Sequence, residues 1–297
     1  MSAGQDMTLA DELPAAVASA LAAPAPPSTM TIDAAGIPFF VRGWGSPEDP
    51  PLLLVHGVTS SSETWWRVGP ALAASRRRVV APDLPGHGRT GHWTGHRAFA
   101  DNARDLAALI DAAGIGVDGL AVVGHSWGAM TVAEMPALGV RPRSLVLLDP
   151  PAMPLAAMAA MADDPIDRAY DDLDEAVTAI GAQNLLWPYG DVRARAQALV
   201  DLDPIAARAV LLENGDWDGA IHALRRDVPL GVPTWLIRGD PAEGGLVPDD
   251  AAAAIGEVVG SDHVITITRG THSPHRLQPA ATVAALLRAL GAADGAT

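Results

Sequence analysis

Apolar residues occur along the chain as short runs separated by stretches with helical spacing. The runs are rich in Leu, Val and Ile, which is typical of strands that are buried on both faces of a parallel sheet. Strand-like runs that alternate with helical patterns predict βαβ units and therefore an α/β fold with a mostly parallel, twisted sheet flanked by helices. The predicted buried strands are 52–55, 78–81, 120–123, 145–148, 234–237 and 263–268.

Two earlier segments, 30–32 and 39–42, predict an antiparallel hairpin at one edge of this sheet. Helical spacing is clearest at 99–113, where the apolar residues recur every three or four positions and the acidic residues lie between them. Residues 280–290 show the same spacing and predict a closing helix. These elements would give an α/β core that comprises residues 29–150 and 231–297.

The segment 151–230 breaks the alternation of strands and helices. It contains several short helical patterns, no convincing strand and a cluster of acidic residues between Asp163 and Glu175. We predict that it is a helical lid inserted between the two parts of the core. Residues 1–28 predict an N-terminal leader, in which a short amphipathic helix is followed by a proline-rich stretch and packs loosely on the core.

Composition narrows the classes of partner and site. The 35 acidic and 20 basic residues give a formal net charge of −15, which argues against nucleic acid or an anionic membrane as a partner. The absence of cysteine excludes disulfides, thiolate metal sites and a cysteine nucleophile. The first 28 residues lack Lys and Arg, and no stretch reaches the roughly 18 apolar residues of a membrane span, so a cytoplasmic location is expected.

The strongest chemical signal is Gly124-His-Ser126-Trp-Gly128, which lies between a predicted strand and a helical pattern. A chain that passes from strand to helix through one residue strains that residue, and the flanking glycines remove side chains that would collide. This geometry would present the Ser126 hydroxyl at a helix N-terminus, where the helix dipole favours a developing oxyanion. The alternative interpretation is an ordinary glycine-rich turn.

A second signal, His56-Gly57-Val58, ends another predicted strand. The backbone N–H of Val58 would converge with that of Trp127, and two such donors form an oxyanion hole. The alternative is a tight turn, and in both cases we expect His56 to be structural.

Several motifs together resemble the α/β-hydrolase superfamily, in its serine esterase and lipase-like branch. They are His56-Gly57, the run 81–88, Gly124–Gly128, Leu145–Asp149 and the late His272. The resemblance covers roughly residues 30–150 and 230–290, and it implies the order nucleophile, acid, base along the chain. It identifies His272, which follows the last strand, as the expected general base, with His275 as the alternative.

The acid is expected after the strand 234–237. The family's usual position holds Ala242, so the candidates are Asp240 and Glu243. We prefer Asp240, because a short side chain at a strand tip orients an imidazole more rigidly than a Glu in a glycine-flanked loop. Asp149 serves as the acid in some relatives, but Pro150 and Pro151 follow it, and we interpret it as the start of the lid.

The resemblance implies a serine hydrolase that cleaves carboxylic esters of small to medium, fairly apolar substrates, without metal or cofactor. A lactonase, thioesterase, perhydrolase or C–C bond hydrolase with the same residues stays open, as does a non-catalytic receptor. Epoxide hydrolases and haloalkane dehalogenases of this superfamily carry Asp in place of Ser126. Trp127 and Trp187 are expected to line an acyl pocket, whereas Trp65 and Trp66 are expected to pack the core. The oligomeric state is left open.

Overall fold

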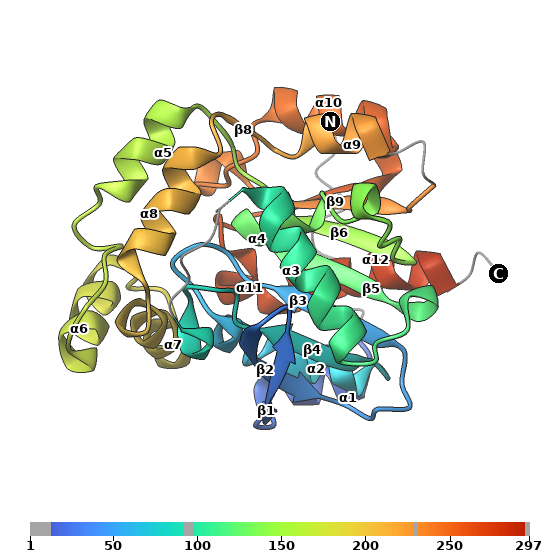
Figure 1. Ribbon diagram of the computed structural model, residues 1–297, viewed down its shortest axis with the longest axis horizontal. Helices are drawn as coiled ribbons and strands as arrows, with labels where there is room; N and C mark the ends of the chain where they lie inside the picture. Colours follow the sequence, from blue (N-terminus) through green and yellow to red (C-terminus); the bar gives the residue numbers. More distant parts are fainter. Residues whose placement is uncertain (1–12, 92–97, 228–230, 295–297) are drawn as a thin grey trace.

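The computed structural model describes residues 13–91, 98–227 and 231–294, and an eight-stranded sheet forms its centre (Figure 1). The strand order is β1-β2-β4-β3-β5-β6-β9-β10. β2 pairs antiparallel with β1 and β4, and all other neighbours pair parallel. The strands are β1 (Ser28–Ala34), β2 (Ile37–Trp44), β3 (Pro51–Val55), β4 (Arg78–Pro82), β5 (Ala121–His125), β6 (Ser144–Leu148), β9 (Thr234–Gly239) and β10 (Val264–Ile267).

The central strands are apolar throughout because both faces of the sheet are buried. In β3, Leu52 and Leu54 join one hydrophobic core, whereas Leu53 and Val55 join the other, as the two-residue period of a strand requires. Helices cover the two faces, with α3 and α4 in front of the sheet in Figure 1. One face packs against α1 (Ala15–Ala22), α2 (Val68–Ala74) and α12 (Pro279–Asp294), and the other against α3 (Phe99–Ala112), α4 (Trp127–Val132) and α10 (Asp249–Val259).

This architecture confirms the predicted fold class. Each predicted strand is present, the hairpin forms the edge of the sheet as β1 and β2, and the predicted helices at 99–113 and 280–290 correspond to α3 and α12. The strands that matter for the site extend further than the apolar runs: β5 continues to His125 and β9 to Gly239.

Four helices between β6 and β9, α5 to α8, lie beyond one end of the sheet, on the left in Figure 1. These helices are α5 (Leu155–Ala162), α6 (Leu173–Gln183), α7 (Tyr189–Val200) and α8 (Pro204–Glu213), and we call residues 152–218 the cap. The prediction of no strand was wrong here, because β7 (Ala152–Met153) and β8 (Trp217–Asp218) pair antiparallel where the cap leaves and rejoins the core.

The predicted lid boundary at 230 lies outside the described residues. The last helix of the predicted lid, α9 (Ile221–Asp227), packs beside α10 and belongs to the core layer.

The described part of the predicted leader contains α1, which is seated on α2 and α12. Val17 of this helix is fully buried in the core, and the Trp44 indole N–H donates to the Ala25 carbonyl at 3.1 Å. Residues 1–12 of the predicted leader lie outside the described residues. Within the described ranges, no helix is both long enough and apolar enough to cross a membrane.

Candidate active site

The turn between β5 and α4 holds Ser126 in a strained backbone conformation, with φ 54° and ψ −121°. A Cβ added at Gly124 would lie 2.3 Å from the Gly128 carbonyl oxygen, and one added at Gly128 would lie 2.5 Å from that of His56. Only glycine fits at both positions, because real side chains do not tolerate such contacts. The spacing of the two glycines therefore builds the sharp turn that places Ser126 above the carboxyl end of the sheet.

Three side chains from separate strand ends form a continuous hydrogen-bonded chain. The Ser126 hydroxyl lies 2.9 Å from Nε2 of His272, and Nδ1 of His272 lies 2.7 Å from Oδ2 of Asp149. With Nδ1–H donating to the carboxylate, Nε2 is the ring atom left to accept the serine proton. The structure thus brings Ser126 and His272 together, as the sequence predicted, and it adds Asp149.

Asp149 follows β6 and is fully buried. Besides the His272 ring, its carboxylate accepts from the backbone N–H groups of Gly239 at 2.8 Å and Leu246 at 2.9 Å. These bonds compensate the burial of a carboxylate and fix its orientation. Asp149 also has a positive φ of 47°, a strained conformation for a residue with a side chain. A buried, strained and fully bonded carboxylate is suited to orienting an imidazole.

The predicted contact between Asp240 and His272 is wrong. Asp240 follows β9, but its carboxylate accepts the backbone N–H of Ala242 at 2.9 Å and caps the short helix η6 (Pro241–Glu243). Glu243, the other candidate, is exposed. The sheet order explains the difference, because β6 lies between β5 and β9, so the tip of β6 is the one next to the serine turn.

Two other histidines, His125 and His275, lie near His272 but make different hydrogen bonds. His125 Nε2 donates to the His272 backbone carbonyl at 2.8 Å, and His275 Nε2 lies 2.9 Å from the Thr64 hydroxyl. Burial lowers the pKa of both rings well below the usual value, and so does the charge of neighbouring His272 in each case. Both rings are therefore neutral near pH 7. His275, the alternative base, is bonded to Thr64 and buried, and His125 helps to position the loop of His272.

The loop after β3 approaches the serine turn closely. A Cβ added at Gly57 would lie 3.0 Å from the Ser126 Cβ, and Val58 lines the same cavity as Ser126. Trp127 is the first residue of α4, so its N–H has no acceptor in a preceding helical turn. This placement is compatible with an oxyanion hole formed by Val58 and Trp127, which stays a prediction.

His56 is bonded on both ring nitrogens, as its expected structural role requires. Its Nδ1 lies 2.8 Å from the Gly57 carbonyl oxygen, and its Nε2 accepts the Leu84 backbone N–H at 3.0 Å. The ring is fully buried. His56 thereby ties the loop after β3 to the segment after β4.

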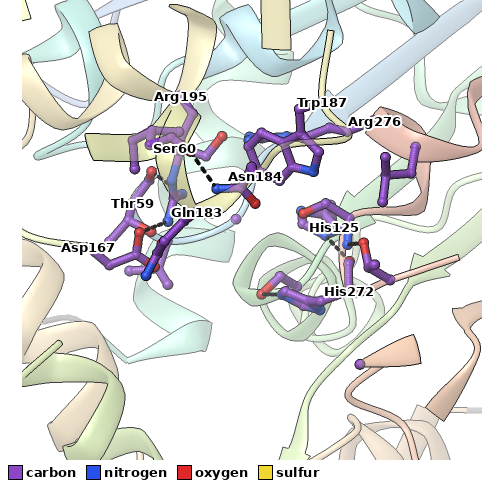
Figure 2. Close-up of a pocket in the computed structure, with 18 of the residues that line it drawn as sticks. Thr59, Ser60, His125, Asp167, Gln183, Asn184, Trp187, Arg195, His272 and Arg276 are labelled. Carbon is purple, nitrogen blue, oxygen red and sulfur yellow. Dashed lines mark hydrogen bonds and ion pairs between the residues drawn. The ribbon is translucent and has the colours of Figure 1, made fainter. Parts of the chain in front are cut away.

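A cavity of about 420 Å³ lies between the serine turn and the cap. This is at the small end of the roughly 300–1,000 Å³ range of ligand pockets. Figure 2 shows His125 and His272 on one side and Asp167, Gln183 and Arg195 of the cap on another. Arg195 and Asp167 form an ion pair at 2.6 Å, and Arg195 also donates to the Thr59 carbonyl.

The tryptophans are distributed between the cavity wall and the core differently from the prediction. Trp187 lines the cavity as expected, but Trp127 is fully buried and packs against His87, with 4.8 Å between ring centroids, so it is not a wall of the cavity. Trp65 is a core residue, and the Trp66 indole donates to Asp191 of α7 at 3.0 Å. The Trp127 side chain thus belongs to the core, although the residue directly follows Ser126 in the chain.

Sequence comparison finds the Alpha/beta hydrolase family, whose model matches residues 52–286. "Epoxide hydrolase A" of Mycobacterium tuberculosis (strain ATCC 25618 / H37Rv) is 32% identical over 226 residues, which cover 71% of this chain and 66% of that protein. "Bifunctional esterase/perhydrolase DCH" of Acinetobacter calcoaceticus is 36% identical over 125 residues, or 40% of this chain and 44% of that protein. The chain thus matches less than two thirds of the length of either relative.

Structure comparison finds the same fold. The crystal structure of E-2-(Acetamidomethylene)succinate Hydrolase superposes with a TM-score of 0.75 at 24% identity and covers 89% of this chain and 99% of that one. A "putative lipase (lip1)" from Acinetobacter baumannii AYE superposes with a TM-score of 0.74 at 15% identity, with all of both chains covered. At these identities the likeness concerns the fold alone.

Proposed function

Because the chain belongs to the alpha/beta hydrolase family, we propose that it is a serine hydrolase that cleaves small carboxylic esters through an acyl-enzyme. The observation that carries the proposal is the hydrogen-bonded chain from Ser126 through His272 to Asp149. The name of the esterase/perhydrolase relative from Acinetobacter calcoaceticus agrees with ester chemistry. The cavity of about 420 Å³ favours small substrates.

In the first step, the Ser126 oxygen attacks the ester carbonyl carbon while its proton passes to Nε2 of His272. Asp149 stabilises the imidazolium that forms and holds the ring in the required tautomer. The negative charge that develops on the carbonyl oxygen is stabilised by the N–H groups of Val58 and Trp127. The tetrahedral intermediate then expels the alcohol, which takes the proton from His272, and leaves an acyl group on Ser126.

In the second step, water attacks the acyl-enzyme. His272 accepts a proton from the water, a second tetrahedral intermediate forms at the same oxyanion position, and the proton returns to the Ser126 oxygen as the acid leaves. The histidine is thus base and acid in turn, which requires one ring to reach both the serine and the solvent side of the cavity. The side chain of His272 is 26% exposed, in keeping with this role.

The epoxide hydrolase relative suggests epoxide opening as a second candidate reaction, but a serine nucleophile is not suited to it. Opening an epoxide by direct attack forms a bond between the nucleophile and an alkyl carbon. A carboxylate would then hold an ester, which water cleaves, whereas a serine would hold an ether, which water does not cleave under these conditions. Ser126 therefore favours substrates with an acyl carbon.

The test is hydrolysis of p-nitrophenyl acetate and butyrate by the wild-type protein and by Ser126→Ala. We expect turnover by the wild type and a fall of kcat by about 10⁴-fold or more in the variant, because the nucleophile acts as a unit with its base. Circular dichroism would establish that the variant is folded. Unchanged ester hydrolysis by folded Ser126→Ala, or turnover of styrene oxide in place of every ester, would overturn the proposal.

A further inference from the structure

Arg276 is a buried cation in the wall of the cavity. It lies in α11 (Pro274–Leu277), four residues after His272, and is only 3% exposed. Its Nη2 donates to the Thr64 hydroxyl at 3.1 Å. Among the described residues, no protein group accepts from its Nε or Nη1, although both atoms are buried. Leaving buried N–H donors of a charged group unpaired is costly, and folded proteins avoid it away from functional sites.

The other arginines near the cavity have carboxylate partners. Arg195 is paired with Asp167 at 2.6 Å, and Arg67 is paired with Asp191. Within the described part of the chain, no carboxylate lies at ion-pair distance from Arg276. Burial, together with the neighbouring charge of Arg195, lowers the pKa of Arg276 to about 9, so the side chain still carries its charge at pH 7. These three arginines therefore face only two carboxylates, those of Asp167 and Asp191, and among the described residues one positive charge is left without a negative partner.

The surroundings of the guanidinium favour a planar anion. The Trp187 ring covers one face of it, with 4.4 Å from the arginine Cζ to the ring centroid, and Figure 2 shows the two side chains together at the edge of the cavity. A stacked guanidinium keeps its edges free for hydrogen bonds in its plane, the geometry in which arginine binds carboxylates. One unmatched positive charge fits one carboxylate, whereas a phosphate monoester would bring about two negative charges.

We infer that Arg276 binds a carboxylate carried by the substrate, at a distance from the carbonyl that Ser126 attacks. This rests on the proposed function, and it names the substrate class as short-chain esters with a second, anionic end. The apolar residues Met161 and Ile180 line the same cavity and would contact the chain between the two ends. The net charge of −15 repels anions at long range, so a preference for such substrates must come from this local contact.

The test compares two esters of equal acyl length, mono-p-nitrophenyl glutarate and p-nitrophenyl pentanoate. The wild type is expected to show a kcat/KM at least about tenfold higher for the glutarate ester, because the buried arginine gains a charge-assisted partner only with that substrate. Arg276→Gln should lower the ratio of the two kcat/KM values by about tenfold or more, and Arg276→Lys should retain part of it. Arg208→Gln, at a cap arginine paired with Asp163 outside the cavity, should leave the ratio unchanged.

A binding measurement separates this inference from the proposed reaction. Calorimetric titration of Ser126→Ala with monoethyl glutarate should give a Kd at least about tenfold tighter than titration of the Ser126→Ala, Arg276→Gln double variant. If the wild type hydrolyses both esters equally well, the carboxylate site is refuted and the hydrolase proposal stands. If the wild type hydrolyses neither ester but the titration shows the Arg276-dependent binding, the hydrolase proposal is refuted and the carboxylate site stands. The wild-type ratio decides the inference even where Arg276→Gln does not fold.

Discussion

Two neighbouring strands of the sheet, β6 and β9, are each followed directly by the dipeptide Asp-Pro, and only one of the two aspartates bonds to the histidine. Asp149 follows β6 with a φ of 47°, and its carboxylate is buried and bonded to His272. Asp240 follows β9 with a φ of −78°, and its carboxylate bonds to the Ala242 N–H in its own turn. The two residues are alike in sequence, so backbone direction and strand order determine which one can act on His272.

The tip of β9 still contributes to the site, but through its backbone. The Gly239 N–H donates to Asp149 at 2.8 Å, and the Asp240 N–H donates to the Gly270 carbonyl at 2.7 Å. One tip therefore supplies the carboxylate, and the other holds that carboxylate and the loop of His272 in place. Substitutions at the two tips should separate these roles.

The largest effect is expected for Asp149→Asn. The amide cannot stabilise an imidazolium, and it would favour the wrong tautomer of His272, so kcat for p-nitrophenyl butyrate should fall by about 10³–10⁴-fold. Thermal unfolding should show a folded protein, since an amide has nearly the same volume. A loss of less than about tenfold would mean that Asp149 is a structural carboxylate and that the comparison of the two tips has no catalytic meaning.

The next effect is expected for Gly239→Ala, which tests the backbone role of the β9 tip. A Cβ there would lie 2.4 Å from the Thr271 carbonyl oxygen, next to His272. We expect the free energy of unfolding to fall by about 1–3 kcal/mol and kcat to fall by about 10–100-fold, because small displacements of catalytic groups are costly. Gly116→Ala is the matched control, since no atom lies within 4 Å of its added Cβ. Equal behaviour of the two variants would contradict the role of the β9 tip.

A smaller effect is expected for Asp240→Ala. It removes the cap of η6 and should lower the free energy of unfolding by about 1 kcal/mol, measured by urea denaturation. Its kcat/KM for p-nitrophenyl butyrate should stay within about threefold of wild type, because His272 keeps its bond to Asp149. A loss comparable to that of Asp149→Asn would restore Asp240 as the acid.

The smallest effect is expected for Glu243→Gln. The side chain is exposed, so both the urea midpoint and kcat/KM should match the wild type within error, and the free energy of unfolding should change by less than about 0.5 kcal/mol. A clear loss of activity in this variant would show that the loop after β9 rearranges to bring a carboxylate to His272.

Much of the fold and part of the site follow from the sequence. The strands are predictable because burial on both faces leaves continuous apolar runs. Ser126 is predictable because close backbone contacts admit only glycine at 124, which faces α4, and at 128, which faces the end of β3. The spacing of the two glycines around Ser126 reflects this constraint. His272 was identified by the resemblance to α/β-hydrolases, which implies a histidine after the last strand.

The acid was not predictable in this way. Nothing in the sequence distinguishes the φ of Asp149 from that of Asp240, and the sheet order that places β6 beside β5 is a tertiary property. The prolines after Asp149 favoured its interpretation as the start of the lid, whereas Asp240 was preferred as a short side chain at a strand tip. Arg276 lies four residues after His272, and that spacing was a usable signal, but the lack of a partner for its Nε and Nη1 among the described residues appears only in the packed structure.

The rate at which a fluorophosphonate modifies the protein, followed by intact mass and by peptide mapping, tests the account most directly. This measurement identifies the nucleophile and reports how strongly it is activated, and it does not depend on knowing the substrate. We predict a single adduct on the peptide that contains Ser126, formed about 10³-fold more slowly by Asp149→Asn and at nearly the wild-type rate by Asp240→Asn. An adduct on another residue, or a slower reaction of Asp240→Asn than of Asp149→Asn, would contradict the account.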